Sequence, residues 1–189
     1  MLNQDKINAL RETLKHGIQT VAVPQLFETP RELAARMVDE ASIEPGNSVL
    51  EPSAGTGRIL QAIMTDDTAR AVIAVEINQQ LADRLREEYP LTDVFDWDFL
   101  QYQRGNYPVD RIIMNPPFIN GADIKHIKHA LTMLKSGGRL VAICANGPRQ
   151  RDQLMPIAEN SGGFWEGLPQ GTFKDKGTNV NTALIVIEG

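Results

Sequence analysis

The stretch Val49-Leu50-Glu51-Pro52-Ser53-Ala54-Gly55-Thr56-Gly57 passes from a short apolar run through a glycine-rich turn into a segment with helical spacing. The same alternation recurs along the chain, and alternating strands and helices require crossover connections and a mostly parallel sheet. The expected strands are 47–51, 71–76, 110–114 and 138–144, with a weaker one at 92–96, and the expected helices are 57–64, 78–89, 122–134 and 148–160. This pattern predicts an α/β fold with helices on both faces of the sheet.

The end of the chain follows a different pattern. Two further strand-like runs, 161–169 and 181–188, are joined by polar, glycine-rich residues without helical period, which predicts a hairpin-like pair. An antiparallel last strand on an otherwise parallel sheet is a common arrangement. With these two runs, the expected sheet has seven strands.

Two helices are expected before the first strand. Thr29 is placed to cap a helix that runs to about Ala41, with Pro30 in its first turn. Upstream, apolar residues at spacings of three and four over 5–15 indicate an amphipathic helix. We therefore divide the chain into an N-terminal helix and linker, 1–25, and one folded domain, 26–189.

Composition limits the possible classes of protein. A chain of 189 residues that is 42% hydrophobic and 23% charged suits one soluble domain with one core. Because no apolar run approaches the roughly 20 residues that span a bilayer, and the N-terminus lacks a secretory apolar segment, we expect a cytoplasmic protein with no membrane partner. The single Cys144 lies in an apolar run and is expected to be a buried thiol.

The glycine turn and a downstream acid predict a nucleoside pocket. Gly55 and Gly57 permit close approach of a ligand to the backbone, and free amides at the helix start could receive a carboxylate. Glu76 ends the strand 71–76, where its carboxylate could accept hydrogen bonds from ribose hydroxyls. A dinucleotide fingerprint would need glycine at Leu60, and a phosphate loop would need lysine at Arg58, so both alternatives fail.

Asn115, Pro116, Pro117 and Phe118 follow directly on the strand 110–114. They therefore lie at a strand's carboxyl end, where open parallel sheets bind ligands. The two prolines fix their own φ angles and hold Asn115 extended. The Asn115 side-chain oxygen and a proline carbonyl could hold both hydrogens of an exocyclic amine, a poor nucleophile that such acceptors would activate for alkylation. Phe118 would stack on the planar target. The alternative is that Phe118 is simply a residue of the hydrophobic core.

Charged side chains suggest where a polymer would bind. The net charge of −5 is the wrong sign for a protein that binds nucleic acid over its whole surface, so any such contact must be local. The candidate phosphate contacts are Arg149, Arg151, Lys174 and Lys176. Solvated loop charges are an equally good interpretation of these four. The set Lys125, His126, Lys128 and His129 lacks the spacing of metal-binding histidines, so we interpret it as a solvated helix face and expect no metal.

These motifs, in this order, resemble the class I S-adenosylmethionine-dependent methyltransferases, and most closely the N6-adenine DNA methyltransferases. The resemblance covers about 26–189 and implies a Rossmann-like catalytic domain with Asn115-Pro116-Pro117-Phe118 as its catalytic loop. Asp98 matches the acid that contacts the cofactor adenine better than Asp96 does. The residues that the resemblance assigns to S-adenosylmethionine are Thr29, Pro30, Glu51, Pro52, Ser53, Ala54, Gly55, Gly57, Glu76, Ile77, Asp98, Phe99 and Asn115. The expected substrate contacts, which follow from ring stacking and from charge and not from the resemblance, are Phe118, Arg149, Arg151, Lys174 and Lys176.

The resemblance leaves the substrate open. DNA is the first choice of polymer and RNA the second, while a protein glutamine amide would suit the same loop, although tyrosine is more usual there than Phe118. The family's sequence-specific members carry a target-recognition region for which this chain has no room, so we expect a partner subunit or homodimer, recognition through shape, or low specificity. A cofactor-binding subunit without catalysis is a further alternative, against which the intact 115–118 loop argues.

Overall fold

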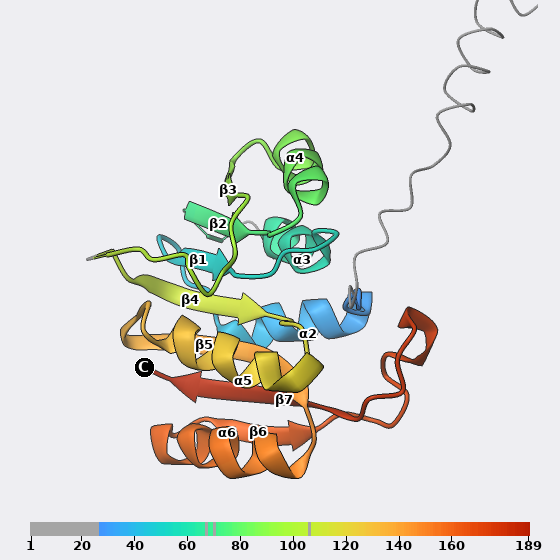
Figure 1. The fold of residues 1–189 in the computed structure, drawn as a ribbon. Helices are drawn as coiled ribbons and strands as arrows, with labels where there is room; N and C mark the ends of the chain where they lie inside the picture. Colours follow the sequence, from blue (N-terminus) through green and yellow to red (C-terminus); the bar gives the residue numbers. More distant parts are fainter. Residues whose placement is uncertain (1–26, 67, 70, 106) are drawn as a thin grey trace, which may run out of the picture.

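The computed structural model describes residues 27–66, 68–69, 71–105 and 107–189 (Figure 1). The expected N-terminal helix and linker, 1–25, lie outside these residues. The helices are α2 (Arg31–Ala41), α3 (Arg58–Asp66), α4 (Gln79–Glu88), α5 (Ala122–Leu131) and α6 (Pro148–Ser161), with short 3₁₀ turns η1 (Ile119–Gly121) and η2 (Lys174–Lys176). The strands are β1 (Ser48–Glu51), β2 (Ala71–Val75), β3 (Thr92–Phe95), β4 (Val109–Met114), β5 (Leu134–Ala145), β6 (Phe164–Gly167) and β7 (Thr182–Glu188).

In the described part of the chain, seven strands form one sheet in the order β3-β2-β1-β4-β5-β7-β6. The pairs from β3 to β5 are parallel, and β7 runs antiparallel to both of its neighbours, β5 and β6. The predicted α/β sheet with an antiparallel last strand is therefore confirmed. β7 is buried almost throughout because it lies between two other strands.

The helices divide between the two faces of the sheet. Successive strand residues point to opposite faces, so Val49 packs with the core residues of α2 and α3, while Leu50 packs with those of α5 and α6. Figure 1 shows α5 and α6 on the near side of the sheet. Cys144, on β5, is fully buried as expected, and burial raises the pKa of its thiol. The described helices include none long and apolar enough to cross a membrane.

One predicted boundary is wrong. The helical pattern of 122–134 was expected to continue to residue 134, but α5 ends at Leu131 and β5 already begins at Leu134. The Met133 carbonyl accepts a hydrogen bond from the Val109 amide at 2.8 Å, and Leu134 is in register with Val109. Strand pairing with a distant segment thus overrides the local helical spacing.

The parallel arrangement brings the carboxyl ends of β1, β2 and β4 to one edge of the sheet (Figure 1). The turn 52–57 follows β1, Glu76 follows β2, and Asn115 follows β4. Three segments distant in sequence therefore meet at the edge where a ligand of an open α/β sheet binds.

Candidate active site

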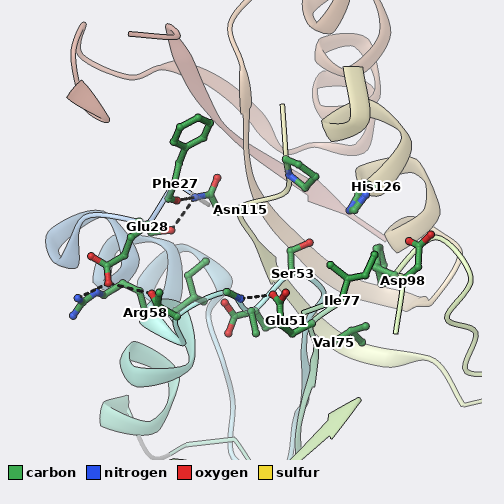
Figure 2. Close-up of a pocket in the computed structure, with 18 of the residues that line it drawn as sticks. Phe27, Glu28, Glu51, Ser53, Arg58, Val75, Ile77, Asp98, Asn115 and His126 are labelled. Atoms are coloured by element: carbon green, nitrogen blue, oxygen red, sulfur yellow. Dashed lines mark hydrogen bonds and ion pairs between the residues drawn. The ribbon is translucent and has the colours of Figure 1, made fainter. Parts of the chain in front are cut away.

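A cavity opens at this edge of the sheet, and Figure 2 shows the side chains around it. Most of the residues predicted to bind a cofactor line it. These are Thr29, Glu51, Ser53, Ala54, Gly55, Glu76, Ile77, Asp98, Phe99 and Asn115, and Pro117 of the predicted catalytic loop joins them. The described structure does not place Pro30, Pro52, Gly57, Pro116 or Phe118 in the cavity lining.

Glu76 connects the glycine turn to the end of β2. Its Oε2 accepts a hydrogen bond from the Gly55 amide at 2.7 Å, and its Oε1 accepts one from the Asn78 amide at 2.8 Å. Gly55 has φ of +54°, which suits glycine. Each carboxylate oxygen can accept a further hydrogen bond, so Glu76 remains able to bind hydroxyls while its orientation is fixed. The Gly55 amide, in contrast, is already occupied and is not free for an anion.

Gly57 does not line the cavity, and its lack of a side chain instead allows two helices to pack closely. It has φ of +81°, and a Cβ at this position would lie 2.7 Å from Leu85 Cδ2 and 3.0 Å from Tyr89 Cε2. Both partners belong to α4 or its end. The glycine therefore allows α4 to pack against the start of α3, a reason for glycine that sequence spacing could not distinguish from ligand approach.

Glu51 forms part of the cavity floor. Its side chain is almost completely buried, and burial raises the pKa of its carboxyl well above the ordinary value. Its Oε2 is buried without a hydrogen-bond partner. A buried carboxyl with an unpaired oxygen is a group that a polar ligand atom could satisfy.

The Asn115 side chain is held in one orientation. Its Nδ2 donates to the Phe27 carbonyl at 2.9 Å and to Thr29 Oγ1 at 3.1 Å. Because a carbonyl oxygen only accepts, the amide cannot be reversed, and Oδ1 is left buried without a partner. The expected capping role of Thr29 is wrong: α2 shows no side-chain cap, and the hydroxyl instead positions Asn115.

The aromatic member of the 115–118 loop lies in the core. Phe118 is 8% exposed and stacks on Phe27, with ring centroids 6.0 Å apart and planes 15° apart. The Phe173 ring meets Phe118 edge to face at 6.3 Å. The core alternative for Phe118 therefore describes this structure, and the ring is available to a planar ligand only after one of its neighbours moves.

The far side of the cavity has the features of a purine site. Ile77 is 67% exposed and Trp97 is 54% exposed, although both are large and apolar. Asp98 lines the cavity beside them, whereas Asp96 pairs with Arg86 at 3.1 Å and is not in the lining. Exposed apolar surface next to a carboxylate acceptor suits a planar base with an amino group.

His126 contradicts the expected solvated helix face. Lys125 and Lys128 are exposed, but His126 is 8% exposed, lines the cavity and packs against Phe99 with ring centroids 5.6 Å apart. Burial lowers the pKa of its imidazole to about 4. The described residues contain no group of side chains suited to hold a metal ion.

The predicted substrate cations lie at the same edge of the sheet. Arg149 Nη1 donates to the Asn120 carbonyl at 3.2 Å, next to the 115–118 loop, and Arg151 Nε donates to Asn146 Oδ1 at 2.8 Å. Lys174 is exposed in η2, the turn between β6 and β7. Lys176 belongs to the same turn.

Some cavity residues were not assigned from the sequence. The additional lining residues are Phe27, Glu28, Thr56, Arg58, Ile59, Val75, Trp97 and His126. Glu28 Oε1 accepts from Thr56 Oγ1 at 3.1 Å and forms an ion pair with Arg58 at 2.8 Å, so the segment before α2 is tied to the glycine turn (Figure 2). The resemblance assigned the neighbouring Thr29 and Pro30 to the cofactor, but nothing in the sequence indicates the contacts that Glu28 makes.

A family model described as the methyltransferase small domain matches residues 33–160. The chain belongs to this family. Its structural neighbours include class I methyltransferases, and S-adenosylmethionine is the cofactor of this group. The sequence-based family prediction is thereby confirmed.

Known relatives of this methyltransferase domain differ in substrate. An rRNA methyltransferase from Streptomyces thermotolerans is 40% identical over 103 residues, which are 53% of this chain and 33% of the relative. The modification methylase CviBIII from Paramecium bursaria Chlorella virus NC1A is 27% identical over 99 residues, which are 50% and 26%. The solved 23S rRNA methyltransferase ErmE shares the fold, with TM-score 0.62, 22% identity, and coverage of 85% and 68%. The chain spans a third or less of the length of these two curated relatives.

Proposed function

We propose that this domain transfers the methyl group of S-adenosylmethionine to the exocyclic N6 amino group of adenine in a nucleic acid. The observation that carries the proposal is the Asn115 amide, whose Nδ2 is held by Phe27 and Thr29 while Oδ1 has no partner. An amino group brings the hydrogen that this acceptor lacks.

The cavity fits the cofactor, part by part. Glu76 would accept hydrogen bonds from the ribose hydroxyls, and Asp98 would accept one from the adenine amino group. Ile77 and Pro117 offer apolar surface for the purine, and the unpaired Glu51 Oε2 offers a partner at the cavity floor. When bound, S-adenosylmethionine supplies an electrophilic methyl group on a positively charged sulfur.

The protein's part in the reaction is positioning. Asn115 Oδ1 and a proline carbonyl of the 115–118 loop would each accept one hydrogen of the amine, which favours a tetrahedral nitrogen whose lone pair is free for the methyl carbon. With S-adenosylmethionine bound, the C–S bond would be exchanged for the new N–C bond, and the loop acceptors would hold the amine hydrogens until one proton leaves to solvent. Orientation of two reactants accounts for most of the rate in such a site, which is why Asn115 needs two fixed anchors.

DNA is the first candidate polymer, and RNA is the second. The order and type of the 26–118 motifs support DNA, and the relationship to a modification methylase agrees with it. The rRNA methyltransferase relative, at higher identity, favours RNA. Arg149 and Lys174 would contact phosphates of either polymer, and a separate recognition subunit or a homodimer would add site selection.

The test is transfer of labelled methyl from S-adenosylmethionine to duplex DNA, single-stranded DNA, RNA and a protein extract, with mass spectrometry of the hydrolysed products. N6-methyladenine in one nucleic acid supports the proposal and selects the polymer. Methylglutamine in protein, or cofactor binding without transfer to any of the four, would contradict it.

A further inference from the structure

His126 differs from the other polar residues on its helix. On α5, Lys125 and Lys128 are exposed, and His129 Nε2 lies 2.9 Å from the Tyr102 carbonyl, so its imidazole is engaged inside the protein. His126 is more than nine-tenths buried, lines the cavity, and has an Nδ1 without any hydrogen-bond partner. A buried polar atom left unpaired destabilises the protein, so the presence of this one needs a reason.

The surroundings of His126 indicate which part of a ligand it would meet. Its ring packs on Phe99, and the charge of Asp98, which precedes Phe99 and also lines the cavity, acts on its imidazole. The other titratable group acting on it is His129. Figure 2 draws His126 and Asp98 together, away from Glu28 and Arg58. Asp98 and His126 thus both line the proposed purine end of the cavity.

The protonation state of His126 fits a neutral partner. Burial lowers the pKa of the imidazole to about 4, so the ring is uncharged at neutral pH. A neutral imidazole carries one donor and one acceptor nitrogen. It can therefore pair with the edge of a purine, where donors and acceptors alternate, without placing a cation near the positively charged sulfur of the methyl donor.

We propose that His126 is a specificity-determining residue that hydrogen-bonds the same edge of the cofactor purine as Asp98. The inference rests on the proposed function, because it requires S-adenosylmethionine to occupy this cavity. His126 would recognise the purine of the cofactor, whereas Asn115 would bind the amino group of the target.

The experiment measures binding, independent of catalysis. Calorimetry would give the affinity of the wild-type protein, of His126→Leu and of His126→Asn for S-adenosylhomocysteine and for S-inosylhomocysteine. The second ligand differs only at the purine edge in question, where oxygen replaces the amino group and N1 carries a proton. Lys125→Gln, an exposed neighbour on the same helix, is the matched control, and circular dichroism checks that each variant is folded.

The wild type is expected to prefer S-adenosylhomocysteine. His126→Leu should lose about three- to tenfold of that preference. His126→Asn, whose amide can occupy the place of Nδ1, should retain most of it, and Lys125→Gln should match the wild type. Equal preference in wild type and in His126→Leu would overturn the role of His126 alone. No binding of S-adenosylhomocysteine to the wild type would overturn the cofactor assignment as well, so the two failures are distinguishable.

Discussion

The Phe27 carbonyl oxygen lies 2.9 Å from Asn115 Nδ2 and accepts its hydrogen, which joins the segment before α2 to the loop after β4. Thr29 Oγ1 completes the anchor at 3.1 Å. The same segment also places the Phe27 ring on Phe118, so anchoring of the amide and access to it depend on one stretch of chain. Binding of a planar target on Phe118 would therefore require the Phe27 ring to move.

The second anchor can be removed without changing side-chain volume. Thr29→Val deletes the acceptor for Asn115 Nδ2 in a residue that is 3% exposed. We expect kcat to fall about tenfold, because a loosened amide misplaces Oδ1, while the affinity for S-adenosylhomocysteine changes little. Thr29→Ser keeps the hydroxyl and should retain activity. Steady-state kinetics with calorimetry checks this, and equal loss in both variants would contradict the anchoring role.

Glu76 is expected to govern cofactor affinity. Glu76→Gln removes the charge that orients the group through Gly55 and Asn78 and that strengthens bonds to ribose hydroxyls. Calorimetry should show binding of S-adenosylhomocysteine weakened about tenfold or more. Asp96→Asn, an acid outside the cavity lining, is the control, and unchanged affinity in Glu76→Gln would refute the ribose assignment.

Gly57→Ala should destabilise the protein by packing. The new methyl would meet Leu85 and Tyr89, whereas Gly46, with φ of +94°, has nothing within 4 Å of an added Cβ. Gly46→Ala should therefore lower the free energy of unfolding only through left-handed backbone strain, by about 1 kcal/mol. Denaturant unfolding should show Gly57→Ala less stable by a further 1–3 kcal/mol or so. Similar losses in both variants would show that α4 does not press on this position.

Glu51 predicts a pH dependence of stability. Burial raises its folded-state pKa well above 4.5, so the stability that the neutral carboxyl contributes is fully present below pH 4.5 and is lost as pH rises through the raised pKa. Glu51→Gln removes this loss. Its free energy of unfolding relative to wild type should rise with pH by up to about 1.4 kcal/mol per unit in that window. A pH-independent difference would mean that Glu51 titrates normally.

The fold could be predicted from sequence because its central strands are buried on both faces. Runs such as 71–75 and 112–114 are apolar for that reason, and the turn 52–57 and Asn115 follow strand ends by topology. The sequence therefore predicted which segments would meet at one edge of the sheet.

The roles that sequence could not predict depend on contacts between distant segments. Thr29 looked like a helix cap because its target, Asn115, is 86 positions away. Gly57 looked like a ligand contact because Leu85 and Tyr89 are on another helix. His126 lies between Lys125 and Lys128 on α5, so its sequence surroundings indicate an exposed residue. Its burial depends on contact with Phe99, which belongs to a distant segment.

The most direct test of the account is Asn115→Ala, compared with the wild type in single-turnover transfer to the accepted nucleic acid and in binding of S-adenosylhomocysteine. The proposed role of Asn115 Oδ1 is to hold the target amine, so transfer should fall by about a hundredfold or more, while cofactor affinity, to which Asn115 adds one lining contact, should fall by about threefold at most. Parallel loss of transfer and of cofactor binding would show that Asn115 is structural, and retained transfer would show that the amine is held elsewhere.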